Sequence, residues 1–112
     1  MSRVDPAAID ELRALMGDEF GSLIDAFHTD SREQIDAIAG AIADADAEQL
    51  RRQAHGLRGA CINLGANELA ELCHRIEECG RAGDCAKAAT LLPALRLEFE
   101  SVRATLSELT TR

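Results

Sequence analysis

Residues 50–65 of the chain read LRRQAHGLRGACINLG, and the spacing of the apolar side chains in this stretch decides the fold. Apolar and small residues recur at alternating steps of four and three, which places them on one face of an α-helix. The members of this row are Leu50, Ala54, Leu57, Cys61 and Leu64. We therefore predict a helix that buries this row and ends at Gly65, because glycine adopts a left-handed backbone conformation at little cost.

Two further helices are predicted before this one. Asp5 followed by Pro6 is a helix-start signal, because aspartate can accept bonds from free N–H groups and proline at the first helical position loses no bond. Asp18 is the predicted cap of a long second helix. The apolar row of that helix is Phe20, Ile24, Phe27, Ile35, Ile38 and Ile42. Asp46 and Gln49 resemble a capping box that opens the third helix.

Two more helices are predicted after Gly65. The inward residues of the fourth are Leu69, Leu72, Cys73 and Ile76. Asp84 is the predicted cap of the fifth helix, whose apolar row is Leu92, Leu95, Phe99, Val102, Leu106 and Leu109. Pro93 interrupts this row early. Because proline removes one backbone hydrogen bond and clashes with the preceding turn, we expect a kink or a separate short helix there.

The composition agrees with an all-helical protein. Of the 112 residues 46% are hydrophobic, but there are only three Phe and no Trp or Tyr, so Leu, Ile and Ala must build the core. The predicted connections are short, which makes neighbouring helices antiparallel. We predict an all-α fold, an antiparallel up-and-down four-helix bundle with a short additional N-terminal helix, in a single domain over residues 1–112.

The charge and the absence of long apolar runs narrow the classes of function. A formal net charge of −8 argues against a nucleic-acid partner, because affinity for the phosphate backbone depends on clustered Lys and Arg. We expect a protein partner instead. No apolar run approaches the ~20 residues needed to cross a bilayer, and the first ten residues lack the features of a signal peptide. We therefore expect a cytoplasmic protein that is not attached to a membrane.

His55 is predicted to lie on the outer face of the third helix, roughly 140° from the centre of the apolar row. Its neighbours on that face are Arg51, Arg52, Arg58 and Gly59, one turn away, and Ile62, two turns away. Neutral imidazole has a lone pair that can attack a phosphoryl group, and adjacent arginines disfavour its protonation and would stabilise the phosphorylated product. A merely solvated histidine is the alternative that these residues alone leave open.

The segment 54–65, AHGLRGACINLG, closely resembles the signature of histidine phosphotransfer domains, which is A-H-x-L-K/R-G followed by small residues and a later Asn-Leu-Gly. The resemblance continues through Leu69, Leu72 and Ile76-Glu77, similar to the leucine-rich fourth helix of the family. It covers nearly the whole chain when the flanking helices are counted, although only the central half is specific.

This resemblance implies a four-helix bundle in which His55 is phosphorylated on a ring nitrogen and exchanges the phosphoryl group with the aspartyl phosphate of receiver domains. It also implies that Arg58 stabilises the phosphoryl group and that Gly59 leaves clearance for a partner. Most family members carry Lys at position 58, and Arg keeps the charge while changing the geometry. Glu77 matches a position where some members place Gln or Glu, so it could accept the Nδ1 proton and leave Nε2 as the nucleophile.

We therefore expect a phosphorelay carrier that accepts a phosphoryl group on His55 from one receiver and transfers it to another. The expected partners are response-regulator receivers, a hybrid histidine kinase, or both, docking through Ile62 and the edges of helices one and two, with Arg51 and Arg52 on the rim. We expect no cofactor in this chain and assign Mg²⁺ to the receiver, because no acidic cluster lies beside His55. The sequence has no glycine-rich phosphate loop, so we expect neither autokinase activity nor an enzyme, and we expect a monomer.

Two other classes stay open. A non-catalytic helical docking module could sequester a kinase or a receiver without chemistry. A metal-binding or thiol-sensing bundle could use Cys73, His74, Cys79 and Cys85, but their spacing is unlike known zinc motifs, so we expect no metal site. His28 and His74 lack the surroundings of His55 and are expected to be ordinary surface or boundary residues.

Overall fold

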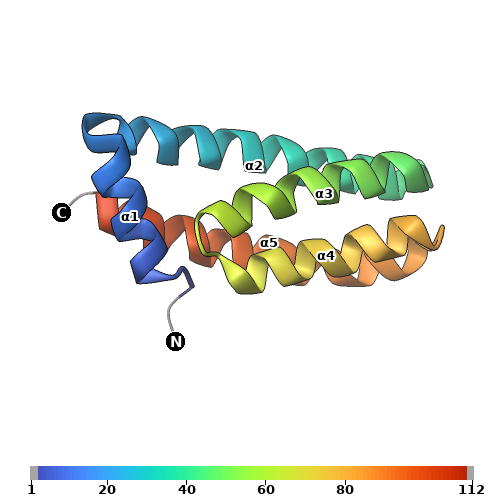
Figure 1. The fold of residues 1–112 in the computed structure, drawn as a ribbon. Helices are drawn as coiled ribbons and strands as arrows, with labels where there is room; N and C mark the ends of the chain where they lie inside the picture. The colour runs from blue at the N-terminus through green and yellow to red at the C-terminus, as the bar shows by residue number, and fades with distance from the viewer. Residues whose placement is uncertain (1–2, 111–112) are drawn as a thin grey trace.

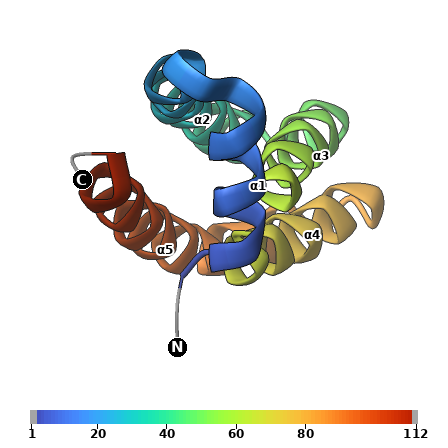
Figure 2. The same cartoon turned by 60° about the vertical axis from the view of Figure 1, so that its left-hand side comes forward.

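The chain folds into helices alone, and no strand is present within residues 3–110, the part that the computed structural model describes. In chain order the elements are α1 (Pro6–Met16), the 3-10 turn η1 (Gly17–Glu19), α2 (Phe20–Ala43), α3 (Ala47–Asn63), α4 (Asn67–Arg81) and α5 (Cys85–Thr110). The helices α2 to α5 run back and forth along a common axis, and α1 crosses one end of the bundle (Figures 1 and 2). The predicted all-α bundle with a short N-terminal helix is confirmed.

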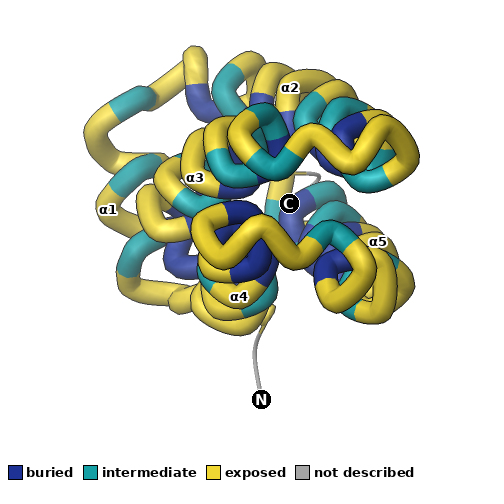
Figure 3. Tube along the Cα trace, turned by 90° about the vertical axis from the view of Figure 1, so that its right-hand side faces the viewer, coloured by how far each residue is buried: buried dark blue, intermediate teal, exposed yellow. Residues whose placement is uncertain are grey.

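The four long helices pack in a ring in the order of the chain. The packed pairs are α2 with α3, α3 with α4, α4 with α5, and α5 with α2. The view along the bundle shows the buried residues on the inner side of each helix (Figure 3). It follows that the seam between α3 and α4 and the seam between α2 and α5 lie on opposite sides of the molecule. Over the described residues no helix has the length and apolar character needed to cross a membrane.

The predicted apolar rows form one core. The row of α3 is entirely buried, as are most members of the other rows. Ile42, Leu72, Leu92 and Leu109 are partly buried at the edge of the core. The core is made of aliphatic side chains together with Phe27 and Phe99, whose rings are tilted toward each other with centroids 6.4 Å apart. Burial of this apolar surface between the helices stabilises the fold.

Three aspartates cap helices as predicted, namely Asp5, Asp46 and Asp84. Each side-chain Oδ1 accepts a hydrogen bond from a backbone N–H two or three residues later, at 3.0 to 3.1 Å, the donors being Ala7, Gln49 and Lys87. Such caps contribute about 1 kcal/mol each to helix stability. They define the starts of α1, α3 and α5.

Two expectations about helix boundaries were wrong. Asp18 does not cap α2: it lies inside η1, and Glu19 precedes α2 without a side-chain cap. The physical reason is that residues 17–19 already form a helical turn that runs into α2, so the free N–H groups lie earlier in the chain. The separate short helix expected at Pro93 is wrong as well, because α5 is one helix with Pro93 inside it, while the kink stays a prediction. The proline ring is exposed, and burial of Ala88 and Leu95 on its two sides holds the helix together.

Gly65 ends α3 as predicted, with a positive φ of 67°. The N–H of Ala66 bonds the carbonyl of Cys61 at 2.9 Å, and the N–H of Gly65 bonds that of Ile62 at 3.0 Å, which is the Schellman pattern of helix termination. The carbonyl of Gly65 also accepts a bond from the N–H of Asp5 at 2.9 Å. The turn between α3 and α4 is therefore joined directly to the start of α1.

Gly80 brings the end of α4 close to the start of α3. A Cβ atom at this position would lie 2.8 Å from the N of Arg51 and 2.9 Å from the carbonyl oxygen of Ala47, both of them backbone atoms that cannot easily move. Only glycine fits here without displacing a helix. This close approach sets how the last two turns of α4 lie beneath the outer face of α3.

Candidate functional site

His55 projects from the outer face of α3, and its side chain is 66% exposed. Its neighbours Ala54 and Leu57 are fully buried, so the rotation of the helix turns the imidazole away from the core. The Nδ1 atom lies 3.2 Å from Oε2 of Glu77 on α4. Because this contact engages only Nδ1, the Nε2 atom stays available on the exposed side of the ring.

Glu77 is a buried carboxylate on which three cationic or potentially cationic side chains converge. Its side chain is 1% exposed. The Oε2 atom contacts Nδ1 of His55 and accepts a hydrogen bond from Arg81 at 2.8 Å, whereas the Oε1 atom faces Arg58 at 3.6 Å. Oε1 has no hydrogen-bond partner within the described residues. A carboxylate in this position is held in place by charge on several sides.

The charge state of Glu77 follows from this competition. Burial opposes ionisation, but the hydrogen bond with His55 and the charges of His55, Arg81 and Arg58 outweigh it, so that the pKa of the Glu77 carboxyl is lowered. The group is therefore an anion near neutral pH. An anion at this place accepts a hydrogen bond from Nδ1–H and favours the tautomer whose lone pair is on Nε2.

The arrangement of the arginines differs from the ring of three predicted around His55. Arg51 and Arg52 both pair with Glu48 one turn earlier on α3, at 2.6 and 3.4 Å. The hydrogen bond from Arg51 is the main reason why the pKa of Glu48 falls to about 2. Among these three arginines, Arg58 alone forms an ion pair with the carboxylate beneath the ring. The sequence carries a signal for these two pairs, because Glu48 lies three and four residues before the two arginines, the spacing at which helical ion pairs form.

The helix surface beside His55 is bare. Gly59 is exposed, and a Cβ atom built on it would meet no atom within 4 Å. On the other side, a Cβ atom on Gly56 would lie 2.9 Å from Nε2 of Gln34, the far end of a flexible side chain. No side chain at position 59 restricts access to the ring.

Arg81 and Gly80 belong to the site and were missed by the sequence analysis. Arg81 is the last residue of α4, and it donates to Glu77 and, at 3.1 Å, to Glu78. The four-residue spacing between Glu77 and Arg81 is a signal that could have indicated the pair. The role of Gly80 could not be predicted, because it depends on the distance between two helices.

An apolar groove runs along α1, α2 and α3, starting one residue beyond Gly59. It encloses about 300 Å³. Its lining is Leu12, Met16, Leu23, Ala26, Phe27, Asp30, Ser31, Ala60, Asn63 and Leu64. Ile62 is 54% exposed and is not part of this lining. The apolar surface near the site thus lies mainly between the first three helices, with Ile62 as a separate exposed residue.

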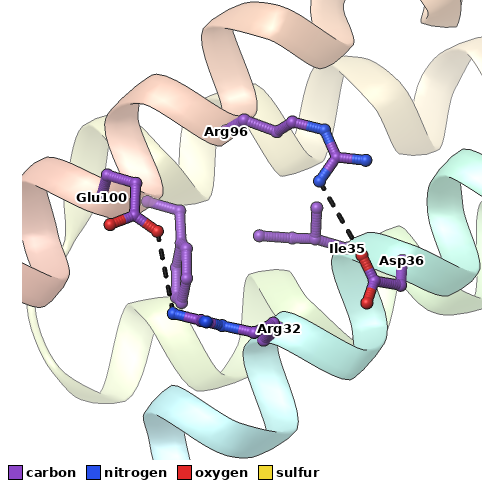
Figure 4. Close-up of a pocket in the computed structure, with 6 residues that line it drawn as sticks. Arg32, Ile35, Asp36, Arg96 and Glu100 are labelled. Carbon is purple, nitrogen blue, oxygen red and sulfur yellow. Dashed lines mark ion pairs between the residues drawn. The ribbon is translucent and has the colours of Figure 1, made fainter.

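A second hollow of about 300 Å³ lies between α2 and α5, on the side of the bundle opposite His55. Two ion pairs cross it, Arg32 with Glu100 and Arg96 with Asp36, both at 3.8 Å, and Ile35 projects into the space between them (Figure 4). Both pairs join exposed side chains at more than hydrogen-bond distance, so they contribute little to stability. This hollow has no contact with the histidine site.

The remaining histidines and the cysteines do not assemble into a second site. His28 is partly buried against Phe27, and burial together with the charge of Arg103 lowers the pKa of its imidazole. All four cysteines are free, and three of them, Cys61, Cys73 and Cys79, are buried. Throughout residues 3–110 no three His, Cys, Asp or Glu side chains lie close enough together to hold a metal ion.

Comparison with known proteins assigns the family. The Hpt domain family matches residues 22–105. The crystal structure of histidine-containing phosphotransfer protein B from Pseudomonas aeruginosa PAO1 is similar, with a TM-score of 0.92 and 32% sequence identity over 98% of this chain and 96% of that one. No curated protein matches the chain. The family match extends over most of the bundle and includes the whole His55 region, so the chain belongs to the Hpt family and has a histidine phosphotransfer role in phosphorelay signalling.

Proposed function

We propose that this protein carries a phosphoryl group on His55, accepting it from the aspartyl phosphate of one receiver domain and delivering it to the aspartate of another. The observation that carries the proposal is the exposed imidazole whose Nδ1 contacts a buried carboxylate while its Nε2 stays free. This combination gives a nucleophile of fixed orientation that a partner can reach. His28 and His74 lack it, because no hydrogen bond engages a ring nitrogen of His28 or Nδ1 of His74 in the described chain.

The chemistry needs no external acid or base. Nε2 of His55 attacks the phosphorus of the aspartyl phosphate, the N–P bond forms, and the P–O bond to the aspartate breaks, so that the electron pair leaves with the carboxylate. The proton stays on Nδ1, and the ring becomes a phosphorylated cation. Glu77 stabilises that cation from below because its carboxylate is 3.2 Å from Nδ1. Attack by a second receiver's carboxylate reverses each step.

Arg58 is proposed to stabilise the phosphoryl oxygens. Its guanidinium lies 3.6 Å from Oε1 of Glu77, which is an ion pair but not a hydrogen bond. Its side chain is 36% exposed and lies one turn beyond His55. Leaving Glu77 for a phosphoryl oxygen therefore costs Arg58 little, and the planar guanidinium suits phosphate geometry.

The receiver is proposed to dock over the apolar groove of α1, α2 and α3. The groove ends at Ala60, next to the bare surface of Gly59, so a partner that fills it also covers His55. Gly59 would then let the backbone of the partner approach the ring. Ile62 extends the apolar contact, while Arg51 and Arg52 lie on the rim as charges for the acidic active site of a receiver.

The proposal also covers the metal ion, the oligomeric state, the location and the partners of the protein. We assign the magnesium ion to the receiver, since the carboxylates near His55 are each engaged by an arginine. We propose that the protein is a monomeric carrier without kinase activity, that residues 1–112 act as one domain, and that it works in the cytoplasm with receivers or a hybrid histidine kinase. The negative net charge, which disfavours a nucleic-acid partner, supports a protein partner, and the small size of the bundle supports a single domain.

The test is transfer between purified proteins. Receiver domains are charged with a small-molecule phosphodonor in the presence of Mg²⁺ and mixed with this protein, and intact mass is measured before and after acid treatment. We expect one acid-labile phosphoryl adduct that disappears when an uncharged second receiver is added. His55→Gln should abolish the adduct, while His28→Gln and His74→Gln should keep it.

Two results would contradict the proposal. An adduct that persists in His55→Gln would place the phosphoryl group on another residue. Receiver binding that is equally tight in His55→Gln, with no adduct on the unmodified protein under any of these conditions, would instead identify a non-catalytic docking module.

A further inference from the structure

The contacts of Arg81 go beyond those of a surface ion pair. Its guanidinium is 55% exposed, but it donates at 2.8 Å to an oxygen of a carboxylate that is only 1% exposed. That oxygen, Oε2 of Glu77, is the same atom that faces Nδ1 of His55. Arg81 therefore acts on the group that orients the histidine, although it is on a different helix from His55.

We infer that Arg81 is a positioning residue for phosphoryl transfer: it holds Glu77 so that Oε2 accepts a hydrogen bond from Nδ1–H and leaves Nε2 of His55 as the nucleophile. Among the described residues, Arg81 donates hydrogen bonds to Glu77 and Glu78 and to no atom of the imidazole. Its effect passes through Glu77 alone. The inference rests on the proposed role of His55.

The geometry around Glu77 explains why Arg81 is the cation that fixes it. The alternative cation, Arg58, is 3.6 Å from the other oxygen and forms no hydrogen bond with it. Arg51 acts on Glu77 only through charge at longer range, since its hydrogen bonds go to Glu48. Without Arg81, the buried carboxylate would have His55 as its sole hydrogen-bond donor, and it would turn toward Arg58 or take up a proton.

Two features fix Arg81 in turn. Its Nε atom donates to Glu78 at 3.1 Å, so that two carboxylates bind different sides of the guanidinium. Gly80, the preceding residue, allows α4 to approach the backbone of α3 near Arg51. The position of Arg81 is therefore set by the same close helix contact that brings Glu77 under His55.

The prediction concerns the tautomer of the unphosphorylated protein and its rate of transfer. In Arg81→Gln, ¹⁵N NMR of the imidazole should show the population moving from the Nδ1–H form toward the Nε2–H form. The reason is that the carboxylate of Glu77 is no longer fixed where it accepts a hydrogen bond from Nδ1–H. Phosphoryl transfer from a charged receiver should slow about tenfold, a size typical of losing a partner that orients a functional histidine. Arg81→Lys, which keeps one donor and the charge, should be intermediate in both measurements.

The matched control is Arg75→Gln. Arg75 is an exposed arginine on the same helix that forms no ion pair with any described residue, so its loss changes the net charge equally. It should leave the tautomer and the rate unchanged. Thermal unfolding should be unchanged in Arg75→Gln, because an exposed guanidinium without an ion pair contributes little to stability. It should fall in Arg81→Gln and less in Arg81→Lys, because the buried Glu77 carboxylate loses its nearest cation.

The outcomes separate this inference from the proposed function. An unchanged tautomer in Arg81→Gln would overturn the inference even if His55 is phosphorylated, as would a slowing equal to that of Arg75→Gln. A changed tautomer in a protein that no receiver phosphorylates would support the positioning role and refute the proposed function. If Arg81→Gln unfolds, an unchanged tautomer in Arg81→Lys, measured over a range of pH, would count against the inference.

Discussion

A single residue of the site can lower the stability of its helix and at the same time leave room for a partner. Gly59 is in the interior of α3, where glycine is about 1 kcal/mol less favourable than alanine. The structure supplies no packing reason for it, because a Cβ atom there would meet nothing within 4 Å. Open space alone does not explain this glycine, because Gly40 of α2 is equally free of contacts. The place of Gly59 one turn beyond His55 is what points to a partner outside the molecule.

This argument predicts opposite effects of Gly59→Ala on stability and on transfer. The free energy of unfolding, measured with urea, should rise by about 1 kcal/mol because alanine is the better helix former. Transfer from a charged receiver should slow about tenfold, which corresponds to a steric cost of about 1.4 kcal/mol in the complex. Gly40→Ala is the control, since Gly40 is an exposed glycine of α2 with nothing within 4 Å and should raise stability alone. Equal transfer rates in both variants would refute the clearance role.

The exposure of His55 could be predicted from the sequence, and the family resemblance pointed to Glu77, but the contacts that Glu77 makes beneath the ring could not be predicted from helical periodicity. Helical periodicity fixes which way a side chain points from its own axis, and it gave the outward direction of the imidazole correctly. The contacts of Glu77 with His55 and Arg58 depend on the rotation and separation of α3 and α4, whereas the spacing of Glu77 and Arg81 lies within α4. Periodicity within each helix contains no information about either quantity.

At the scale of the elements, caps are more informative than single helix breakers. Three aspartates predicted the starts of α1, α3 and α5, because each acts on N–H groups two or three residues away. Pro93 was misleading, since the loss of one bond in a helix of 26 residues is outweighed by burial on both sides. Capping side chains thus predict well where a helix begins, whereas a proline alone predicts poorly whether a long helix continues.

The contact between α3 and α4 gives a prediction at this scale. Gly80→Ala should destabilise the protein by about 1–3 kcal/mol, because its Cβ atom would be within 3 Å of backbone atoms of α3 and the helices would have to move apart. Gly40→Ala, which makes the same chemical change in open space, should stabilise it. Urea unfolding measures both. A stabilised Gly80→Ala would show that the two helices can separate without cost.

At the scale of the whole molecule, the bundle joins distant parts of the chain through a buried charge. Glu98 on α5 is 8% exposed and accepts a hydrogen bond from Arg3 at 3.0 Å, which ties the start of the chain to its last helix. Its other oxygen, Oε2, has no partner among residues 3–110. Burial raises the pKa of the Glu98 carboxyl, Arg3 lowers it and Glu68 raises it, and the net change is upward.

A raised pKa means that Glu98 binds its proton more tightly in the folded state than in the unfolded chain. The contribution of Glu98 to stability is then fully present below the unfolded pKa and is lost as the pH rises through the folded pKa. We therefore expect Glu98→Gln to be more stable than the parent by about 1 kcal/mol at pH 7, with a difference that shrinks toward zero near pH 4. Urea unfolding at both pH values tests this.

The control for Glu98 is Glu68→Gln, which removes an exposed carboxylate 3.6 Å from the same Arg3. Its effect should stay within about 0.5 kcal/mol at either pH. If Glu98→Gln is instead less stable than the parent at pH 7, the pair with Arg3 more than offsets the cost of burying the charge, and the expected pH dependence is wrong.

The turn at Gly65 joins the end of α3 to the start of α1 through the hydrogen bond from Asp5, so a substitution at residue 65 acts on both helices. A Cβ atom at this position would lie 2.6 Å from Cβ of Asp5, in addition to the strain of a positive φ. Any larger residue would thus push the start of α1 away from the turn between α3 and α4. Because α1 supplies Leu12 and Met16 to one wall of the apolar groove, the groove would change shape. We therefore expect a substitution at residue 65 to weaken the binding of a receiver, while the imidazole of His55 keeps its full reactivity toward small phosphodonors.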